Sequence, residues 1–188
     1  MFKNRLPLLI VCFVLSFALF SCGGDPKESK EYKELKAELD KIKAQDSVAN
    51  ANIELYKKLA AVNDTTELPQ LDALVATDVK YHDMPEGMPN GLAGFKELLK
   101  MYLTSIPNMQ IEIKHILAEG DIVIAHLGLT GVNSGASGDM PATGKSINVD
   151  GYDCIRIADG KVIEYWTLAN EMKMMTQLGL MPEMGEGE

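Results

Sequence analysis

The sequence predicts an α+β fold, in which helices come first and an antiparallel meander of long strands follows. From residue 27 to about residue 62 there is no Pro or Gly, and apolar residues recur at steps of three and four, as in a helix. From residue 109 onward, four strand-like runs are separated by turn signals such as Asp159-Gly160. We therefore expect a curved antiparallel sheet packed on helices, preceded by an N-terminal helical extension.

The predicted first helix carries a heptad-like seam with one polar interruption. Its members are Tyr32, Leu35, Leu39, Ile42, Asp46, Ala49, Ile53, Tyr56 and Ala60. One interpretation is a single amphipathic helix whose second half packs on the domain and whose first half is a solvated spacer. The other is a coiled-coil stalk that dimerises the protein. In both, residues 22–48 form a tether and helical stalk and residues 49–180 form the main domain.

The remaining elements follow from periodicity and turn chemistry. A short helix is expected over 67–76, a strand over 79–83, a Pro/Gly loop over 84–91 and a helix over 94–105. The four long strands are expected over 109–118, 122–132, 146–157 and 162–169, followed by a helix over 171–178. Residues 181–188 are acidic and Gly-containing, and we expect a disordered tail there.

The N-terminus has the pattern of a signal peptide. Lys3 and Arg5 precede an apolar run over 6–20, which is short for a membrane span. Leu19-Phe20-Ser21-Cys22 resembles the lipobox of bacterial lipoproteins, which implies cleavage after residue 21 and acylation of Cys22. The expected product is a lipoprotein anchored to a membrane of the bacterial envelope, facing the periplasm or the exterior. The alternative is an uncleaved anchor in which Cys22 is incidental.

Composition narrows the classes of partner. The chain has 27 acidic and 18 basic residues, and this negative charge argues against nucleic acid as a partner. Cys154 would be the sole cysteine beyond the lipidation site, so no internal disulfide is expected, and its strand-like setting favours an inert thiol. His82, His115 and His126 lack metal-ligand spacing, and no phosphate loop or nucleophile motif is present. We predict no metal and no cofactor.

Strand alternation selects candidate pocket residues. In the third long strand Asp153 shares a side with Ile147, Val149 and Ile155, so one carboxylate interrupts an apolar row. A carboxylate in an apolar wall is either an acid/base group or is satisfied by structural hydrogen bonds. In the fourth strand, Glu164, Trp166 and Asn170 share a side.

Trp166 is expected to form cavity wall and Asn170 to bind ligand or cap the strand end. His82 and Asp83, next to each other at a strand end, form a second acid/base candidate pair, with an exposed histidine as the alternative. Tyr152 has the opposite parity to Asp153 and would need a bulge to reach the pocket.

Several blocks of the sequence resemble one known family. They are His82-Asp83-Met84-Pro85, Gly91-Leu92-Ala93-Gly94-Phe95, Ala118-Glu119-Gly120-Asp121, Gly151-Tyr152-Asp153-Cys154 and Asp159-Gly160-Lys161-Val162-Ile163-Glu164-Tyr165-Trp166. Together they resemble the SnoaL-like polyketide cyclases (ester cyclases) of the nuclear-transport-factor-2-like superfamily. This resemblance implies a cone-shaped pocket, frequent homodimers through the outer face of the sheet, and cofactor-free acid/base closure of a polyketide ester. Family members commonly have an aspartate four residues after the tryptophan, and this sequence has Asn170 there.

Two functions are compatible with these residues. The first is a lipoprotein that binds a small apolar molecule in its cone without catalysis. The second is a cyclase or isomerase in which Asp153 or His82 removes a proton α to a carbonyl, while Tyr152, Trp166 or Asn170 orients the substrate. A dimeric scaffold acting through its stalk is the third alternative.

Overall fold

The computed structural model describes residues 29–138 and 141–181. The chain divides into two compact units, one ending at Ala44 and the other beginning at Gln45. Helix α2 (Lys30–Ala60) contributes residues to both units. The predicted signal peptide, Cys22 and nearly all of the acidic tail lie outside the described residues. Within the described part of the chain, no helix is both long and apolar enough to cross a membrane.

The described part of the first unit is the start of α2, up to Ala44. The seam residues Tyr32, Leu35, Leu39 and Ile42 are all exposed there. Exposed apolar side chains at this spacing fit either a solvated spacer or a helix that pairs with another chain. The choice between these two interpretations stays open.

The second unit is built on one five-stranded sheet with the order β1-β5-β4-β3-β2. Its strands are β1 (Val75–Tyr81), β2 (Gln110–Glu119), β3 (Ile122–Val132), β4 (Ser146–Ala158) and β5 (Lys161–Ala169). Strands β2 to β5 pair as an antiparallel meander. The α+β class is confirmed.

One edge of the sheet differs from the predicted, wholly antiparallel arrangement. Strand β1 pairs with β5 in parallel. The chain leaves β1 through a loop and helix α4 (Leu92–Ser105) instead of a hairpin, and such a crossover allows neighbouring strands to point the same way. In place of the expected helix over 67–76, the chain forms a 3₁₀ segment, η3 (Thr65–Gln70), and a single helical turn, α3 (Leu71–Leu74). Because this turn ends at residue 74, strand β1 begins at Val75, earlier than predicted.

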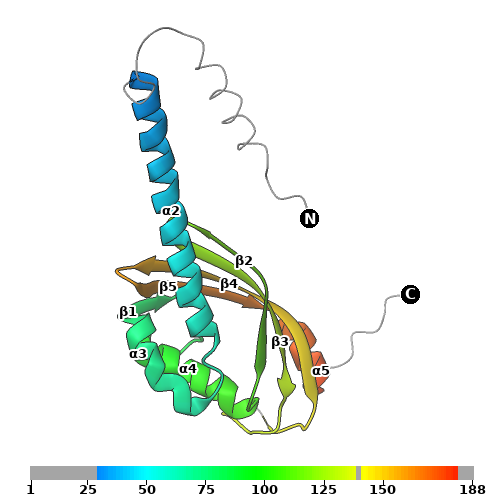
Figure 1. Cartoon of the computed structure of the whole chain (residues 1–188). Coiled ribbons are helices and arrows are strands. Elements are labelled where there is room, and N and C mark those ends of the chain that lie inside the picture. The colour runs from blue at the N-terminus through cyan, green and yellow to red at the C-terminus, as the bar shows by residue number, and fades with distance from the viewer. Residues whose placement is uncertain (1–28, 139–140, 182–188) are drawn as a thin grey trace, which may run out of the picture. The chain divides into compact units, whose positions relative to one another are not determined.

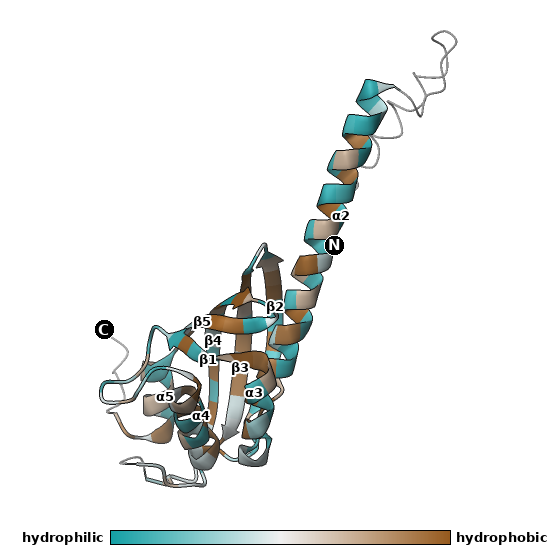
Figure 2. Cartoon of the chain, turned by 90° about the vertical axis from the view of Figure 1, so that its left-hand side faces the viewer, coloured by the Kyte–Doolittle hydropathy of each residue, from teal (hydrophilic) through white to brown (hydrophobic). Residues whose placement is uncertain are grey.

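The helices cover one face of this curved sheet, as Figure 1 shows for α3, α4 and the part of α2 after Ala44. The buried side of α2 contributes Tyr56 and Leu59 to the main core, and Asn52 donates a hydrogen bond of 2.9 Å from Nδ2 to the carbonyl of Gly120 in the β2–β3 turn. Figure 2 shows the apolar residues gathered along the strands, whereas α2 alternates polar and apolar residues. Within the described part of the second unit, no helix covers the other face of the sheet.

Two β-bulges reverse the alternation of strands in mid-course. The pairing of β4 with β5 shifts between Ile157–Val162 and Arg156–Glu164, which leaves Ile163 as the extra residue. The pairing of β2 with β3 shifts between Ile113 and His115. Because a bulge inserts one residue, side chains beyond it change faces relative to a regular strand.

Candidate functional site

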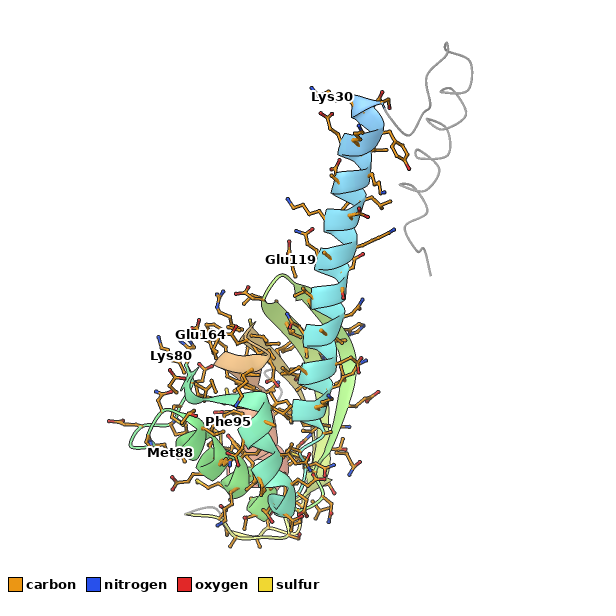
Figure 3. All side chains as sticks on the ribbon, turned by 60° about the vertical axis from the view of Figure 1, so that its left-hand side comes forward. Lys30, Lys80, Met88, Phe95, Glu119 and Glu164 are labelled. Carbon is orange, nitrogen blue, oxygen red and sulfur yellow. The ribbon has the colours of Figure 1, made fainter. Side chains whose placement is uncertain are left out.

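A cavity of about 890 Å³ lies within the second unit, between α4 and the helix-covered face of the sheet. Most of its wall is apolar: Phe95 and Leu98 come from α4, Leu127 and Leu129 from β3, and Ile147 from β4. Figure 3 labels Phe95 on its helix. A cavity of this size with mainly hydrophobic walls is typical of small-molecule sites.

Asp153 is the most buried carboxylate on this wall, with only 7% of its surface exposed. Three hydroxyl groups donate hydrogen bonds to it. Tyr56 and Tyr165 donate to Oδ2 at 2.7 and 2.5 Å, and Thr167 donates to Oδ1 at 2.7 Å. Asp153 thus lies on an otherwise apolar wall, and three structural hydrogen bonds satisfy its carboxylate.

The two tyrosines act as donors because they hold their protons firmly. Burial, and then the charge of Asp153, raises the pKa of both Tyr56 and Tyr165 well above the ordinary value. The tyrosines come from different parts of the chain, Tyr56 from α2 and Tyr165 from β5. Their shared hydrogen-bond acceptor therefore fixes α2 to the sheet from within the core.

Asp83 also borders the cavity, at the end of β1. Its Oδ2 accepts a hydrogen bond from the backbone N–H of Thr167 at 3.0 Å. Beside it, the ring of Tyr81 is stacked on Tyr165 with centroids 5.2 Å apart and is tilted against Phe95. Asp83, Tyr81 and Asp153 therefore share one region of the cavity.

Three predicted site residues lie elsewhere. Trp166, Glu164 and His82 are absent from the cavity wall: the indole stacks on His82 with centroids 4.2 Å apart, and His82 Nε2 lies 2.7 Å from Glu164 Oε2. The bulge at Ile163 explains the error, because it places Tyr165 and Thr167 on the inner face with Val162. His82 and Asp83 are not brought together: Asp83 lines the cavity, whereas His82 contacts Trp166 and Glu164 away from it.

Tyr152 borders the cavity, yet the alternation of β4 turns its ring to the outer face, where it stacks on His126. There His126 is also close to His115, with Nδ1 atoms 3.2 Å apart, and to Asp150. Cys154 is partly buried, and burial raises the pKa of its thiol. Among the described residues, no group of three or more His, Cys, Asp or Glu side chains is arranged to hold a metal ion.

Comparisons with known proteins identify the family. The family model of SnoaL-like polyketide cyclases matches residues 53–178. The chain belongs to this family.

Several solved structures have the same fold as this chain. A Bacillus cereus protein assigned as a polyketide cyclase is 27% identical, with a TM-score of 0.60, and the match covers 70% of this chain and 83% of that one. A SnoaL-like protein from Jannaschia is 19% identical, with a TM-score of 0.63 over 71% of this chain and 95% of that one. TsrD from Streptomyces laurentii is 18% identical, with a TM-score of 0.64 over 70% and 97%. No curated protein matches this chain.

Asn170 occupies the position at which the SnoaL-like resemblance implies an aspartate. It borders the cavity, and its Oδ1 accepts a hydrogen bond of 3.0 Å from the backbone N–H of Lys173. The side chain thereby caps α5 (Glu171–Leu178). An amide does not exchange a proton with a substrate, so this position offers a cap and a polar contact.

Sequence reasoning missed the residues that surround Asp153. Tyr56 belongs to the helical seam, and regular alternation would put Tyr165 and Thr167 on the side opposite to Trp166. Only the knowledge of a bulge at Ile163 would have moved the two β5 residues inward, and no Gly or Pro marks that bulge.

Proposed function

We propose that this protein binds a small, largely apolar molecule in its cavity and does not catalyse a reaction on it. The observation that carries the proposal is the combination of a cavity of about 890 Å³ with a buried carboxylate already occupied by three hydroxyl donors. A carboxylate has roughly four positions at which it accepts hydrogen bonds. With three positions filled by Tyr56, Tyr165 and Thr167, Asp153 has little capacity left to take a proton from a substrate.

Calorimetric titration with 1-naphthalenemethanol, an apolar probe with one neutral polar group, tests this proposal. We expect saturable binding to the wild type and a loss of at least about tenfold in affinity in Ala169→Phe, because Ala169 lines the cavity and the larger ring fills part of it. The matched control is Ala93→Phe on the exposed surface of α4. Equal affinity in all three proteins would contradict binding in the cavity.

A cyclase or isomerase is the second candidate, and one observation favours it. Asp83 lies at the cavity and, among the described residues, only its Oδ2 has a hydrogen-bond partner. Its other oxygen is therefore open to a substrate proton. The 27% identical relative assigned as a polyketide cyclase also supports this alternative.

The variant Asn170→Asp separates the two candidates. The non-catalytic proposal expects no turnover of a model β-keto-ester by the wild type, and turnover by the variant would indicate a family member that has lost its acid/base group. Turnover by the wild type that disappears in Asp83→Asn would establish the enzyme instead.

We further propose that the protein is a lipoprotein of the bacterial envelope, anchored through Cys22. The support is the lipobox-like Leu19-Phe20-Ser21-Cys22 after an apolar run. Metabolic labelling with an alkyne-tagged fatty acid should label the wild type and leave Cys22→Ser unlabelled. Equal labelling of the two would contradict acylation at Cys22.

The outer face of the sheet is proposed to pair with a second copy, as the family resemblance implies. Leu117 and Leu168 are 73% and 70% exposed there, and Ile124 and Tyr152 are about half exposed. Large apolar side chains gathered on one uncovered sheet face favour association over a free surface.

A further inference from the structure

The cavity has a one-sided charge. Among the described residues that line it there is no Lys, Arg or His, whereas four carboxylates are present. Asp150 is paired with Lys114 and His126 away from the cavity. Asp83, Asp153 and Glu171 have no cation as a partner among the described residues, so the cavity wall carries uncompensated negative charge.

Tyr81 supplies an independent observation. Only 7% of this residue is exposed, it lines the cavity, and its hydroxyl has no hydrogen-bond partner among the described residues. Every fully enclosed side-chain nitrogen or oxygen in the described chain has a hydrogen-bond partner. Since the Tyr81 hydroxyl has none, it is not fully enclosed and opens onto the cavity. A polar group in such a position calls for a polar group on the ligand.

The surroundings of this hydroxyl indicate the sign of the charge on that ligand group. The ring of Tyr81 is stacked on Tyr165, whose hydroxyl donates to Asp153. Thr167 donates to both Asp153 and Asp83, so these two carboxylates lie together beside Tyr81. In keeping with this, burial is the main cause that raises the pKa of Tyr81, followed by Tyr102 and then by the charges of Asp153, Asp83 and Glu171. An anionic ligand group would be repelled there, while a cationic group would be attracted.

The aromatic rings of the wall add to this preference. Phe95, Tyr81 and Tyr165 form a contiguous cluster with centroid separations of 5.2 to 5.8 Å, and Tyr102 also lines the cavity. A cation within about 6 Å of an aromatic face is attracted by the ring. The site therefore offers carboxylates, a free phenolic oxygen and aromatic faces, a combination that suits an ammonium group.

We propose that the ligand is an apolar molecule with a protonated amine, whose ammonium group lies at the Tyr81 hydroxyl within reach of Asp83 and Glu171. This inference rests on the proposed ligand-binding function and names the class of ligand. The ammonium donates to the oxygen of Tyr81 and to the two carboxylates, and the apolar body fills the space between α4 and β3.

Three probes with one ring system test the charge preference: 1-naphthylmethylamine, 1-naphthalenemethanol and 1-naphthoate. At neutral pH they are cationic, neutral and anionic. Calorimetric titration at low ionic strength is expected to give an affinity for the amine about tenfold above that for the alcohol, with the carboxylate weaker than both. The preference should shrink as salt is added, because Asp83 and Glu171 are exposed and salt screens exposed charges.

The double variant Asp83→Asn/Glu171→Gln should reduce the ratio of the affinity for the amine to the affinity for the alcohol at least about fivefold. Tyr81→Phe should reduce the preference as well, since it keeps the ring and removes the oxygen. The matched control Asp78→Asn/Glu97→Gln removes the same charge from exposed positions and should change nothing.

The outcomes separate this inference from the function on which it rests. Binding of the alcohol with no gain for the amine would overturn the ligand class and leave the binding function standing. A preference that survives in Asp83→Asn/Glu171→Gln, or falls equally in the control, would also overturn it. No binding by any of the three probes would overturn both.

Discussion

At the scale of single residues, Asp153 is the group on which the interior depends. Its carboxylate accepts hydrogen bonds from Tyr56 in α2 and from Tyr165 and Thr167 in β5. Sequence alternation alone placed Asp153 on the inner face, because the run from residue 147 to residue 157 alternates without interruption. Its partners could not be found this way, since they come from a helix far away in the chain and from a strand with a hidden bulge.

Replacing this acceptor should destabilise the fold. In Asp153→Asn the amide nitrogen takes the place of one oxygen and does not accept hydrogen bonds, so at least one buried hydroxyl loses its acceptor. We expect the free energy of unfolding to fall by about 1–3 kcal/mol, measured by urea denaturation. An unchanged midpoint of the urea denaturation curve would contradict a stabilising role of the Asp153 carboxylate.

The buried tyrosines predict how stability depends on pH. The pKa of Tyr56 is raised above its ordinary value of 10.0, and the pKa values of Tyr81 and Tyr165 are raised too, all chiefly by burial. The folded state therefore keeps these protons at a pH where the unfolded chain loses them. Stability should be flat below about pH 9 and should fall above pH 10 by about 1.4 kcal/mol per pH unit for each tyrosine.

Denaturation curves recorded between pH 8 and pH 11 measure this slope. Tyr56→Phe removes one of the titrating groups, so its slope should be shallower although its stability at pH 8 is lower. Parallel slopes for the wild type and the variant would contradict the protonated state assigned to Tyr56.

At the scale of elements, the bulge in β5 decides which side chains meet the ligand. It turns Tyr165 and Thr167 inward and sends Glu164 and Trp166 to the outer face, where they contact His82. The boundaries of β3 and α5 could be predicted from turn and cap residues, whereas a bulge without Gly leaves no mark in the alternation. The positions of β3 and α5 were therefore predictable, whereas the faces of β5 were not.

This placement yields a prediction opposite to the one from alternation alone. Trp166→Ala should leave the affinity for 1-naphthalenemethanol within about twofold of the wild type, because the indole is outside the cavity, and should lower stability by about 1 kcal/mol through the lost stacking on His82. A large loss of affinity without a change in stability would show that the indole reaches the ligand.

The side chain of Asn170, at the position where the family resemblance implies an aspartate, caps the N-terminus of helix α5. Asn170→Ala removes the cap on the N–H of Lys173 and should cost about 1 kcal/mol of stability, measured by thermal or urea unfolding, whereas Asn170→Asp should keep the cap. If Asn170→Ala were as stable as the wild type, the capping role would be wrong.

At the scale of the whole molecule, the second unit offers a covered and an uncovered face of the same sheet. The covered face holds the cavity, and the uncovered face presents Leu117 and Leu168. The α+β class followed from the order of periodic segments, and the parallel pairing of β1 could not, because sequence patterns do not show which strand a crossover will join.

The exposed apolar side chains on the uncovered face of the sheet indicate that two copies associate there. A charged side chain introduced on this face should weaken the association. Leu117→Glu should shift the protein from dimer toward monomer in sedimentation equilibrium, because a carboxylate placed on an apolar interface must lose its hydration. Glu97→Lys on exposed α4 is a control that changes surface charge elsewhere. A wild-type protein that stays monomeric at high concentration would contradict the proposed pairing.

Native mass spectrometry of the protein recovered from the cells that make it tests the central claim most directly. The account predicts a population heavier than the mature, acylated protein by the mass of one small organic molecule, which is released intact on denaturation and is lost in Ala169→Phe. Recovery of the protein without any bound molecule would contradict binding. Chemical conversion of the released molecule when it is incubated with the protein would contradict the absence of catalysis.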